Sequence, residues 1–397
     1  MNESRARILF VNHVARLGGA ECSLLDLVRH LDPQRYELHA ALPARGELPE
    51  LLRQAGVRVH TLPLRRLRKT ANPAVLAGNA LNVAWVSRRL AALIRRESIA
   101  LVHANSTTAH LYAGPAAGRC GVPAVWHCRD LVSLGRLGPK LFRQASRVIA
   151  IADCVRLHLA PYVDDPAKLR TVRHGIDPSF CAAPDAAVRV RAQLGIPAGT
   201  RVVGMAGQMV PWKRHRTFLV MAARIARELP GTRFVVAGAD LFNEHPDYTQ
   251  ELRGLVDELG LAESVTFTGH RSDMADLLAS LDVVVHPAVR EPLGRVLLEA
   301  MAVGRPVVAV NACGPAEIIR NGIDGVLTDS DSPWELADAV LHLLHEPALA
   351  ARLGEAGRTR VAEHFSATAT ARQIEAVYAE LLPPGGGPRS ELHARGD

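Results

Sequence analysis

Short runs of β-branched and apolar residues alternate with longer amphipathic segments along almost the whole chain. Six such runs in the N-terminal half are predicted strands, at residues 8–12, 38–42, 57–61, 100–103, 124–127 and 148–151. The segments between them have the periodicity of helices, most clearly at 20–31 and 75–96. Strands that alternate with helices in this way indicate a parallel sheet covered on both faces.

The alternation stops once and then begins again. Residues 175–200 are rich in proline and glycine, and five further strand-like runs follow at 202–206, 234–237, 265–268, 283–286 and 307–310. A chain of 397 residues is also long enough for two cores. The sequence therefore predicts two Rossmann-like, doubly wound α/β domains, with the boundary near residues 176–198.

The predicted domains and terminal segments can be given by number. We expect an N-terminal domain at 1–178 and a C-terminal domain at 198–364. A last helix at 366–382 is expected to pack back on the N-terminal domain. The segment 383–397 begins PPGGGP, and we expect it to be disordered.

Composition and charge exclude several classes of protein. No stretch reaches the roughly 20 apolar residues of a membrane-spanning helix, and residues 1–5 contain no apolar signal core, so we expect a cytoplasmic protein. Six scattered cysteines without metal-ligand spacing are expected to be reduced, mostly buried thiols.

The net charge of +7 is concentrated in part in the N-terminal half, at residues 64–69 and at Arg95 and Arg96. Such a patch suits a peripheral contact with the inner face of a membrane or with an acidic acceptor, and a solvated basic face remains an open alternative. No nucleic-acid motif or run of stacking aromatic residues accompanies the charge, so nucleic acid is not an expected partner.

The loops that follow predicted strands are the places to look for a site, because open parallel sheets bind ligands beyond the carboxyl ends of their strands. The first such loop contains Gly18 and Gly19, which let backbone amides approach an anion, although a tight turn explains them equally well. The loop is not G-x-G-x-x-G, and no acidic residue ends the second strand. Both departures are unfavourable for a nicotinamide dinucleotide.

The strongest motif is EPLGRVLLE at residues 291–299, directly after the predicted strand 283–286. Pro292 and Gly294 suit a turn that enters a helix at 295–301, whose first amides would point toward phosphate or sugar oxygens. Glu291 precedes this helix and Glu299 lies more than a turn inside it, so the two carboxylates would reach different parts of one extended ligand. As an alternative, Glu299 is simply a surface residue of the helix.

Glu-x7-Glu after a strand resembles the retaining glycosyltransferases of family 4, the glycosyl transferases of group 1, which have the GT-B fold. The resemblance continues at 304–308 (GRPVV), 313–319 (CGPAEII) and 321–325 (NGIDG). Upstream, GQMVPWK at 207–213 is similar to the family's G-R-x4-K loop, and VRHGID at 172–177 resembles [VI]-x-N-G-[VI]-D. These motifs span most of the chain in the order of the family.

The resemblance implies two domains that face each other across a cleft. It implies that the N-terminal domain, 1–178, binds the acceptor and that the C-terminal domain, 198–364, binds a nucleotide-sugar donor. It implies that Glu299 binds the ribose, Glu291 and the following amides bind the donor sugar, and Lys213 neutralises the diphosphate. The implied donor-binding residues are Gly18, Gly19, Gln208, Lys213, Glu291, Pro292, Leu293, Gly294, Arg295 and Glu299. The implied catalytic residues are His127, near the reacting sugar, together with Lys213 and Glu291.

The chain departs from the family at Gln208, where the family has an arginine, so one cation for the diphosphate is missing. Arginines close enough in sequence to replace it are Arg214, Arg216, Arg290 and Arg295. For His127, a structural histidine at a strand end is the competing interpretation.

The expected reaction moves a hexose-type sugar, with retention of configuration, from an NDP-sugar (UDP favoured) to a hydroxyl of a small-molecule, lipid-linked or glycan acceptor. We expect no metal and no cofactor besides this co-substrate. The sequence D-S-D at 329–331 suggests helix capping rather than a metal motif, and His342 and His345 suggest a surface pair. A nucleotide-sugar 2-epimerase of the same fold and a non-catalytic nucleotide-sugar binder remain alternatives.

Overall fold

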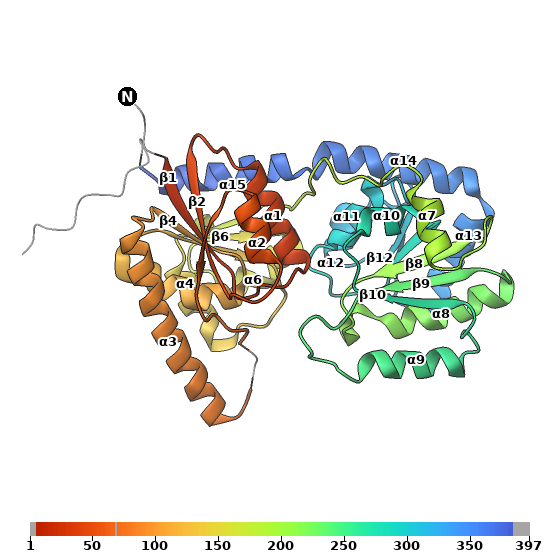
Figure 1. The fold of residues 1–397 in the computed structure, drawn as a ribbon, viewed down its shortest axis with the longest axis horizontal. Helices are drawn as coiled ribbons and strands as arrows, with labels where there is room; N and C mark the ends of the chain where they lie inside the picture. Colours follow the sequence, from red (N-terminus) through yellow and green to blue (C-terminus); the bar gives the residue numbers. More distant parts are fainter. Residues whose placement is uncertain (1–4, 68–69, 384–397) are drawn as a thin grey trace, which may run out of the picture. The chain divides into compact units, whose positions relative to one another are not determined.

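The computed structural model describes residues 5–67 and 70–383. These residues form two compact units. The first unit contains the residues up to Arg173 and those from Ala367 onward, and the second unit is His174–Ser366. Each unit is a parallel sheet between helices (Figure 1), so the predicted pair of doubly wound α/β domains is confirmed. The tail from 384 onward and two residues of the basic segment 64–69 lie outside the described residues.

The described part of the first unit contains a seven-stranded parallel sheet in the order β3-β2-β1-β4-β5-β6-β7. Its strands are β1 (Ala6–Val11), β2 (Tyr36–Leu42), β3 (Arg58–Thr61), β4 (Leu101–Ala104), β5 (Ala124–Cys128), β6 (Arg147–Ala150) and β7 (Leu169–Thr171). Its α-helices are α1 (Gly19–His30), α2 (Leu48–Gln54), α3 (Pro73–Arg96), α4 (Thr107–Cys120), α5 (Gly138–Gln144), α6 (Asp153–Leu159) and α15 (Ala367–Leu381).

The second unit, which lies wholly within the described residues, contains a six-stranded parallel sheet in the order β10-β9-β8-β11-β12-β13. Its strands are β8 (Val202–Ala206), β9 (Arg233–Ala237), β10 (Val265–Gly269), β11 (Val283–His286), β12 (Val307–Val310) and β13 (Val326–Thr328). Its α-helices are α7 (Ala186–Gln193), α8 (His215–Glu228), α9 (Tyr248–Glu258), α10 (Met274–Ala279), α11 (Arg295–Ala302), α12 (Cys313–Ile318), α13 (Pro333–His345) and α14 (Pro347–His364).

Alternate residues of β1 build two separate cores on the two faces of the first sheet. Ile8 and Phe10 pack with residues of α1, α2 and α15, whereas Leu9 and Val11 pack with residues of α3 and α4. This division follows from the period of two along a strand. The C-terminal helix α15 lies beside α1 on the first of these faces (Figure 1).

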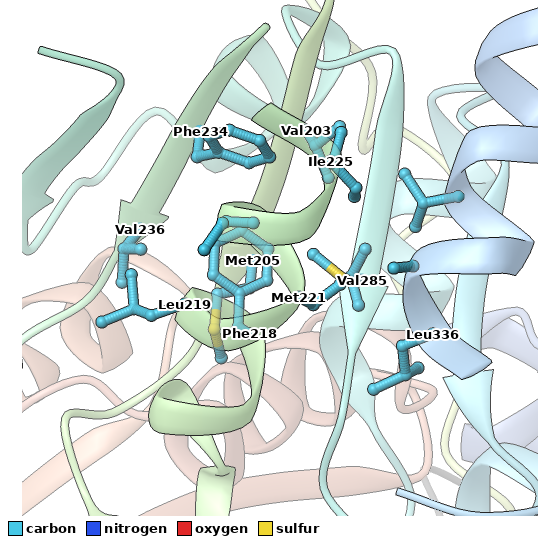
Figure 2. Packing of buried hydrophobic residues seen from close by; sticks show 14 of the residues in the cluster. Val203, Met205, Phe218, Leu219, Met221, Ile225, Phe234, Val236, Val285 and Leu336 are labelled. Atoms are coloured by element: carbon cyan, nitrogen blue, oxygen red, sulfur yellow. The ribbon is translucent and has the colours of Figure 1, made fainter. Parts of the chain in front are cut away.

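The core of the second unit is shown in Figure 2. Phe218 and other apolar residues of α8 pack on strand residues such as Met205, and Leu336 adds the contact of α13. All three of these side chains are buried. The helices α8 and α13 contribute more buried residues to this core than the other helices of the unit, and full burial of each large apolar side chain contributes about 1.5–3 kcal/mol.

Three parts of the fold differ from the prediction. The short strands β7 and β13 were not predicted, because each contains only three residues and lies at a sheet edge. Residues 174–178 belong to the second unit, since Gly175 packs on Phe365 so closely that a Cβ would lie 2.2 Å from its carbonyl oxygen. The predicted connector also contains α7, whose Ala186 and Val190 are buried.

The cysteines are a further correction. Among the described residues only Cys128 is buried, Cys181 is exposed and the other four are half-buried. The expectation of mostly buried thiols is wrong because those four lie in the first or last turn of a helix. No helix in the described ranges is both long and apolar enough to cross a membrane.

Candidate active site

The strand order of the second unit brings two predicted loops together. In the sheet β8 pairs with β11, although 76 residues lie between the end of β8 and the start of β11. The strands β9 and β10 follow on the side of β8, and β12 and β13 follow on the side of β11. Lys213 lies in a short 3-10 turn after β8 (Pro211–Lys213), and Glu291 lies in the loop after β11. Ligands of doubly wound sheets bind at such a switch point. Here Lys213 Nζ lies 2.5 Å from Glu291 Oε2.

A histidine completes this cluster. His286, the last residue of β11, places Nε2 at 3.0 Å from Glu291 Oε2, and both side chains are buried. Burial alone would raise the pKa of Glu291, but the ammonium of Lys213 and the contact with His286 outweigh it and lower that pKa to about 2. Burial lowers the pKa of His286. Glu291 is therefore ionised at neutral pH and accepts a hydrogen bond from a neutral imidazole.

Lys213 is also held by an aromatic neighbour. Its ammonium lies 4.4 Å from the ring centroid of Trp212, whose side chain is half exposed. This cation–π contact leaves a compact positive charge near the protein surface and fixes its direction. Neither Trp212 nor His286 was predicted as a site residue. The only sequence signal for His286 was its place as the last residue of a strand before the motif.

The loop after β11 has a rigid backbone. Gly294 adopts a φ of +94° directly before α11, in the region that favours glycine. The amide of Gly314, on α12, donates a hydrogen bond to the carbonyl of Glu291 at 3.0 Å. A Cβ at Gly314 would lie 2.3 Å from Cα of Leu293, so only glycine permits this approach. The Leu293 side chain is itself buried, so only the backbone of Leu293 is available for its predicted role in binding the donor.

Arg295 and Glu299 occupy successive turns of α11 and bind each other. Arg295 Nε lies 2.7 Å from Glu299 Oε1, and both side chains are largely covered. Glu299 is therefore not simply an exposed surface residue of the helix. Pro292 lies half-buried between Glu291 and the start of α11.

Gln208 lies half-buried in the loop after β8. Of the arginines considered as replacements for the missing cation, Arg214 is bound by Asp331 at 2.6 Å and Arg295 by Glu299. Asp331 is thus an ion-pair partner, and the cap of α13 is Ser332, which accepts a hydrogen bond from the amide of Trp334. The prediction that residues 329–331 themselves cap this helix is wrong by one position.

In the first unit, a buried polar network supports the loop of Gly18 and Gly19. Gly18 is the N-cap of α1, and Gly19 begins the helix in a position where a Cβ would meet nothing within 4 Å. Glu21, in the first turn, is buried and accepts a hydrogen bond from Asn12 at 3.1 Å. Asn105 donates to Asn12 at 3.0 Å. The network links the loops after β1 and β4, the switch point of this sheet.

His127 lies on β5, and its side chain is buried. Its Nδ1 lies 3.0 Å from Nε2 of His103 on the neighbouring strand β4. The structure thus places three of the predicted residues, Gly18, Gly19 and His127, in the first unit and the others in the second.

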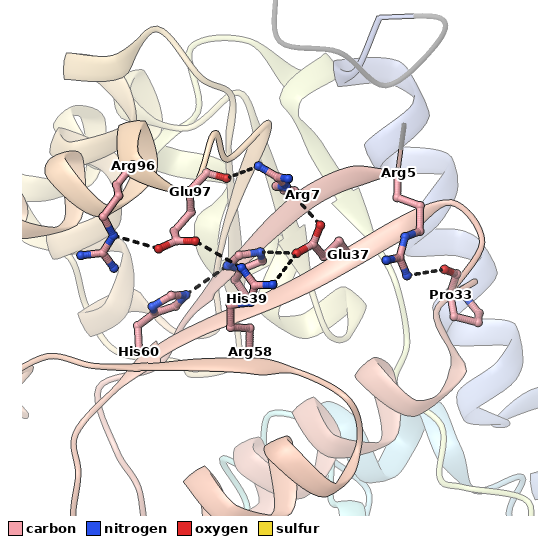
Figure 3. Close-up of polar contacts among 9 residues, drawn as sticks. All are labelled: Arg5, Arg7, Pro33, Glu37, His39, Arg58, His60, Arg96 and Glu97. Atoms are coloured by element: carbon pink, nitrogen blue, oxygen red, sulfur yellow. Dashed lines mark hydrogen bonds and ion pairs between the residues drawn. The ribbon is translucent and has the colours of Figure 1, made fainter. Parts of the chain in front are cut away.

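One group in the described ranges has the composition of a metal site (Figure 3). It contains His39, His60 and Glu97, whose ligand atoms lie within 4.8 Å of one another. His39 Nδ1 and His60 Nε2 are 3.0 Å apart, and the Glu97 carboxylate is bound by Arg96 at 2.8 Å and by Arg58 at 3.4 Å. Two guanidinium groups already neutralise this carboxylate and would compete with a cation, so we assign no metal role to the group.

Comparison with known proteins identifies both halves of the chain. The family model described as Glycosyltransferase Family 4 matches residues 17–180, and the model described as Glycosyl transferases group 1 matches residues 189–360. The D-inositol 3-phosphate glycosyltransferases of Mycobacterium tuberculosis and Mycobacterium bovis are 36% identical over 210 residues. This match covers 51% of the chain but only 41% of the relative, so the similarity spans less than half the length of these relatives.

Solved structures extend the similarity over nearly the whole chain. HepE of Anabaena, solved in complex with UDP and glucose, is similar with a TM-score of 0.82 and 27% identity over 95% of this chain and 100% of that chain. The sucrose-phosphate synthase of Thermosynechococcus elongatus has a TM-score of 0.78 at 21% identity, over 95% and 99% of the two chains, and shows the fold alone. Family models, relatives and fold agree, and the chain therefore belongs to glycosyltransferase family 4, the glycosyl transferases of group 1, with the GT-B fold.

Proposed function

We propose that the protein transfers a hexose from a UDP-sugar to a hydroxyl group of an acceptor, with retention of configuration at the anomeric carbon. The observation that carries the proposal is the cluster of Lys213, Glu291 and His286 at the switch point of the second sheet. The structures of HepE with UDP and with UDP-glucose support the choice of nucleotide.

Each part of the donor has a chemically suited partner in this proposal. When the donor binds, the ion pair between Lys213 and Glu291 weakens, and the Lys213 ammonium neutralises the diphosphate. The amides at the start of α11 bind oxygens of the donor. Glu291, freed to accept, binds hydroxyl groups of the sugar, and Glu299 binds the ribose hydroxyls. Gly18 and Gly19 supply amides for the phosphates. Within the part of the chain that the structure describes, a Cβ at position 19 would meet no atom within 4 Å, so packing does not account for this glycine and close approach of a ligand is the better reason for it.

The chemical step that we propose is attack of the acceptor hydroxyl on the anomeric carbon from the side of the departing phosphate. The bond from the anomeric carbon to the phosphate oxygen breaks, the bond to the acceptor oxygen forms, and the leaving phosphate oxygen takes the acceptor proton. The role of the protein is to stabilise the negative charge that gathers on the diphosphate, through Lys213 and backbone amides. This work needs neither a metal ion nor a further cofactor.

Glu299→Gln is expected to weaken binding of UDP about 10-fold, because one charge-assisted pair of hydrogen bonds to the ribose is lost. The measurement is the rise of Tm with UDP concentration, which reports the dissociation constant. Glu363→Gln, an exposed glutamate on α14, is the matched control and should bind UDP as the unchanged protein does. Equal affinity in the unchanged protein and Glu299→Gln would contradict the ribose assignment.

The alternatives give different products from the same reagent. With UDP-glucose and no acceptor, we expect slow release of UDP and glucose whose first-formed anomer retains the donor configuration, as followed by NMR. A 2-epimer of UDP-glucose would instead identify the epimerase. Binding of UDP-glucose without any turnover would identify the non-catalytic binder.

We also propose that α3 attaches the protein to an anionic membrane surface. Leu81 is 73% exposed and Trp85 48% exposed, one helical turn apart, and the Arg89 guanidinium lies 5.0 Å from the Trp85 ring. Apolar side chains beside arginines suit the boundary between headgroups and acyl chains.

Leu81→Glu is expected to reduce binding to vesicles that contain phosphatidylserine about 10-fold, since a leucine that inserts into the membrane surface would become a carboxylate that the anionic lipids repel. The measurement is co-sedimentation at low and at physiological salt. Leu157→Glu, at a leucine of α6 that is 63% exposed, is the control and should bind as before. Equal loss in both variants would point to net charge alone and against α3.

A further inference from the structure

Three buried side chains of the first unit form a continuous hydrogen-bonded chain. Tyr378 lies on α15, His103 on β4 and His127 on β5. The Tyr378 hydroxyl lies 2.6 Å from Nδ1 of His103, and Nε2 of His103 lies 3.0 Å from Nδ1 of His127. The proposed transfer chemistry gives no task to Tyr378 or His103.

The packing of this unit fixes the order of the three groups. Val125 lies opposite His103 in the register of β4 and β5, so His127, two residues further along, points to the same face of the sheet. The helix α15 covers that face and brings Tyr378 to His103. Tyr36 packs edge-on against the Tyr378 ring at 5.7 Å. None of the three groups can turn away without displacing core residues.

The direction of the first hydrogen bond follows from counting protons. The Tyr378 hydroxyl has one proton, and within the described part of the chain its hydrogen-bond partner is His103 Nδ1 alone. If that nitrogen carried a hydrogen, the hydroxyl would have to accept it and its own proton would be buried without an acceptor. An unpaired buried donor is costly, so the hydroxyl donates to Nδ1.

The second hydrogen bond then has only one direction. Burial lowers the pKa of His103 to about 3, so at neutral pH its ring carries a single hydrogen. Because Nδ1 accepts from Tyr378, that hydrogen is on Nε2 and is donated to Nδ1 of His127. His127 therefore accepts at Nδ1.

We propose that Tyr378 and His103 hold His127 in the tautomer with its hydrogen on Nε2, so that His127 donates a hydrogen bond to the substrate and does not act as a base. The inference rests on the proposed function for the substrate, the UDP-sugar. A base at Nε2 would need a hydrogen on Nδ1 of His127, and both hydrogen bonds of the chain would have to reverse. Tyr378 and His103 are thus positioning residues that act through His127.

The tautomer can be read directly from two-bond ¹⁵N–¹H spectra of histidine-labelled protein, with signals assigned through His103→Asn and His127→Asn. We expect Nδ1 of His127 to have the shift of an unprotonated nitrogen that accepts a hydrogen bond. In Tyr378→Phe the donor is gone, and we expect His103 and His127 to become mixtures of tautomers. Tyr36→Phe removes a hydroxyl from the same aromatic group and should leave both signals unchanged.

The kinetic test uses release of UDP from UDP-glucose. Tyr378→Phe is expected to lower kcat about 5- to 10-fold, which corresponds to one substrate hydrogen bond made in only a fraction of molecules, while KM stays within about twofold. Tyr36→Phe should leave both constants unchanged. A purely structural role for Tyr378 would lower the amount of folded protein without this change in kcat per folded molecule.

The outcomes separate this inference from the proposed function. A hydrogen on Nδ1 of His127 in the unchanged protein overturns the inference, whatever the activity. Failure of the unchanged protein to turn over any UDP-hexose overturns the proposed function, and the spectrum still decides the tautomer. A changed tautomer in Tyr378→Phe with an unaltered kcat overturns the role assigned to it. If Tyr378→Phe does not fold, the spectrum of the unchanged protein decides alone.

Discussion

Lys213→Met is expected to lower the rate of UDP release from UDP-glucose about 100- to 1,000-fold. Removal of one fixed group that stabilises developing charge in an active site has an effect of this size. Lys213 is held by Trp212 and Glu291, so its charge is in place before the reaction begins. The loss should fall mainly on kcat, because charge on the diphosphate increases as the bond to the sugar breaks. Steady-state kinetics with UDP-glucose is the measurement.

Two further variants sharpen this test. Lys168→Met removes another lysine of this lysine-poor chain, in a short turn of the first unit, and should leave kcat unchanged. Lys213→Arg keeps the charge but replaces a compact ammonium with a planar group, and we expect an intermediate loss of about 10-fold. A kcat for Lys213→Met within threefold of the unchanged protein would remove Lys213 from the mechanism.

The protein is expected to lose stability steeply as the pH falls from 7 to 5. Burial lowers the pKa of His103 to about 3, that of His110 to about 4 and that of His215 to about 3. In the unfolded chain these groups titrate near pH 6.5, so below that pH the unfolded state binds more protons and the free energy of unfolding decreases.

The size of this loss follows from the same shifts. Each of the three histidines lowers the free energy of unfolding by about 2 kcal/mol between pH 7 and pH 5. His103 and His110 belong to the first unit and together account for a loss of about 4 kcal/mol there. His13 belongs to the same unit, and burial lowers its pKa to about 4, so it adds about 2 kcal/mol to that loss. His215 accounts for a loss of about 2 kcal/mol in the second unit. The buried carboxyl of Glu21, whose pKa is raised by burial, opposes part of the loss in the first unit.

A single variant isolates one histidine. His110 donates through Nε2 to the carbonyl of Leu141 at 3.0 Å and stacks on Trp126. His110→Gln keeps a donor but cannot take up a proton, so the decrease between pH 7 and pH 5 should be about 2 kcal/mol smaller. Urea unfolding at the two pH values is the measurement, and His342→Gln, at an exposed histidine, is the control. An unchanged pH dependence in His110→Gln would show that this imidazole is not held neutral.

The sequence predicted most of the fold because its strands carry their own signal. Runs such as residues 283–286 and 307–310 are almost wholly β-branched, and the structure has strands with these same bounds. The strands β7 and β13 carry no such signal, since three residues at a sheet edge have too few neighbours to require a pattern. The second unit also starts earlier than predicted, at a glycine whose packing partner is 190 residues away.

The candidate site was only partly predictable, for a physical reason. Family motifs place Lys213 and Glu291 in the site, although nothing local to either residue indicates that the two side chains touch. His286 and Trp212 form contacts that depend on side-chain direction, which no spacing specifies. The contact of Tyr378 with His103 depends on the return of the chain to its first sheet, 275 residues later.

This return has a consequence for biosynthesis. The second unit is one uninterrupted segment, His174–Ser366, so its fold requires no residue that is made after it. The unit that is begun first must wait for α15, which supplies part of its apolar core together with Tyr378. A fragment that ends at Arg173 would expose the face of the sheet that α15 covers, and a nascent chain is in the same condition until its last turn of helix emerges.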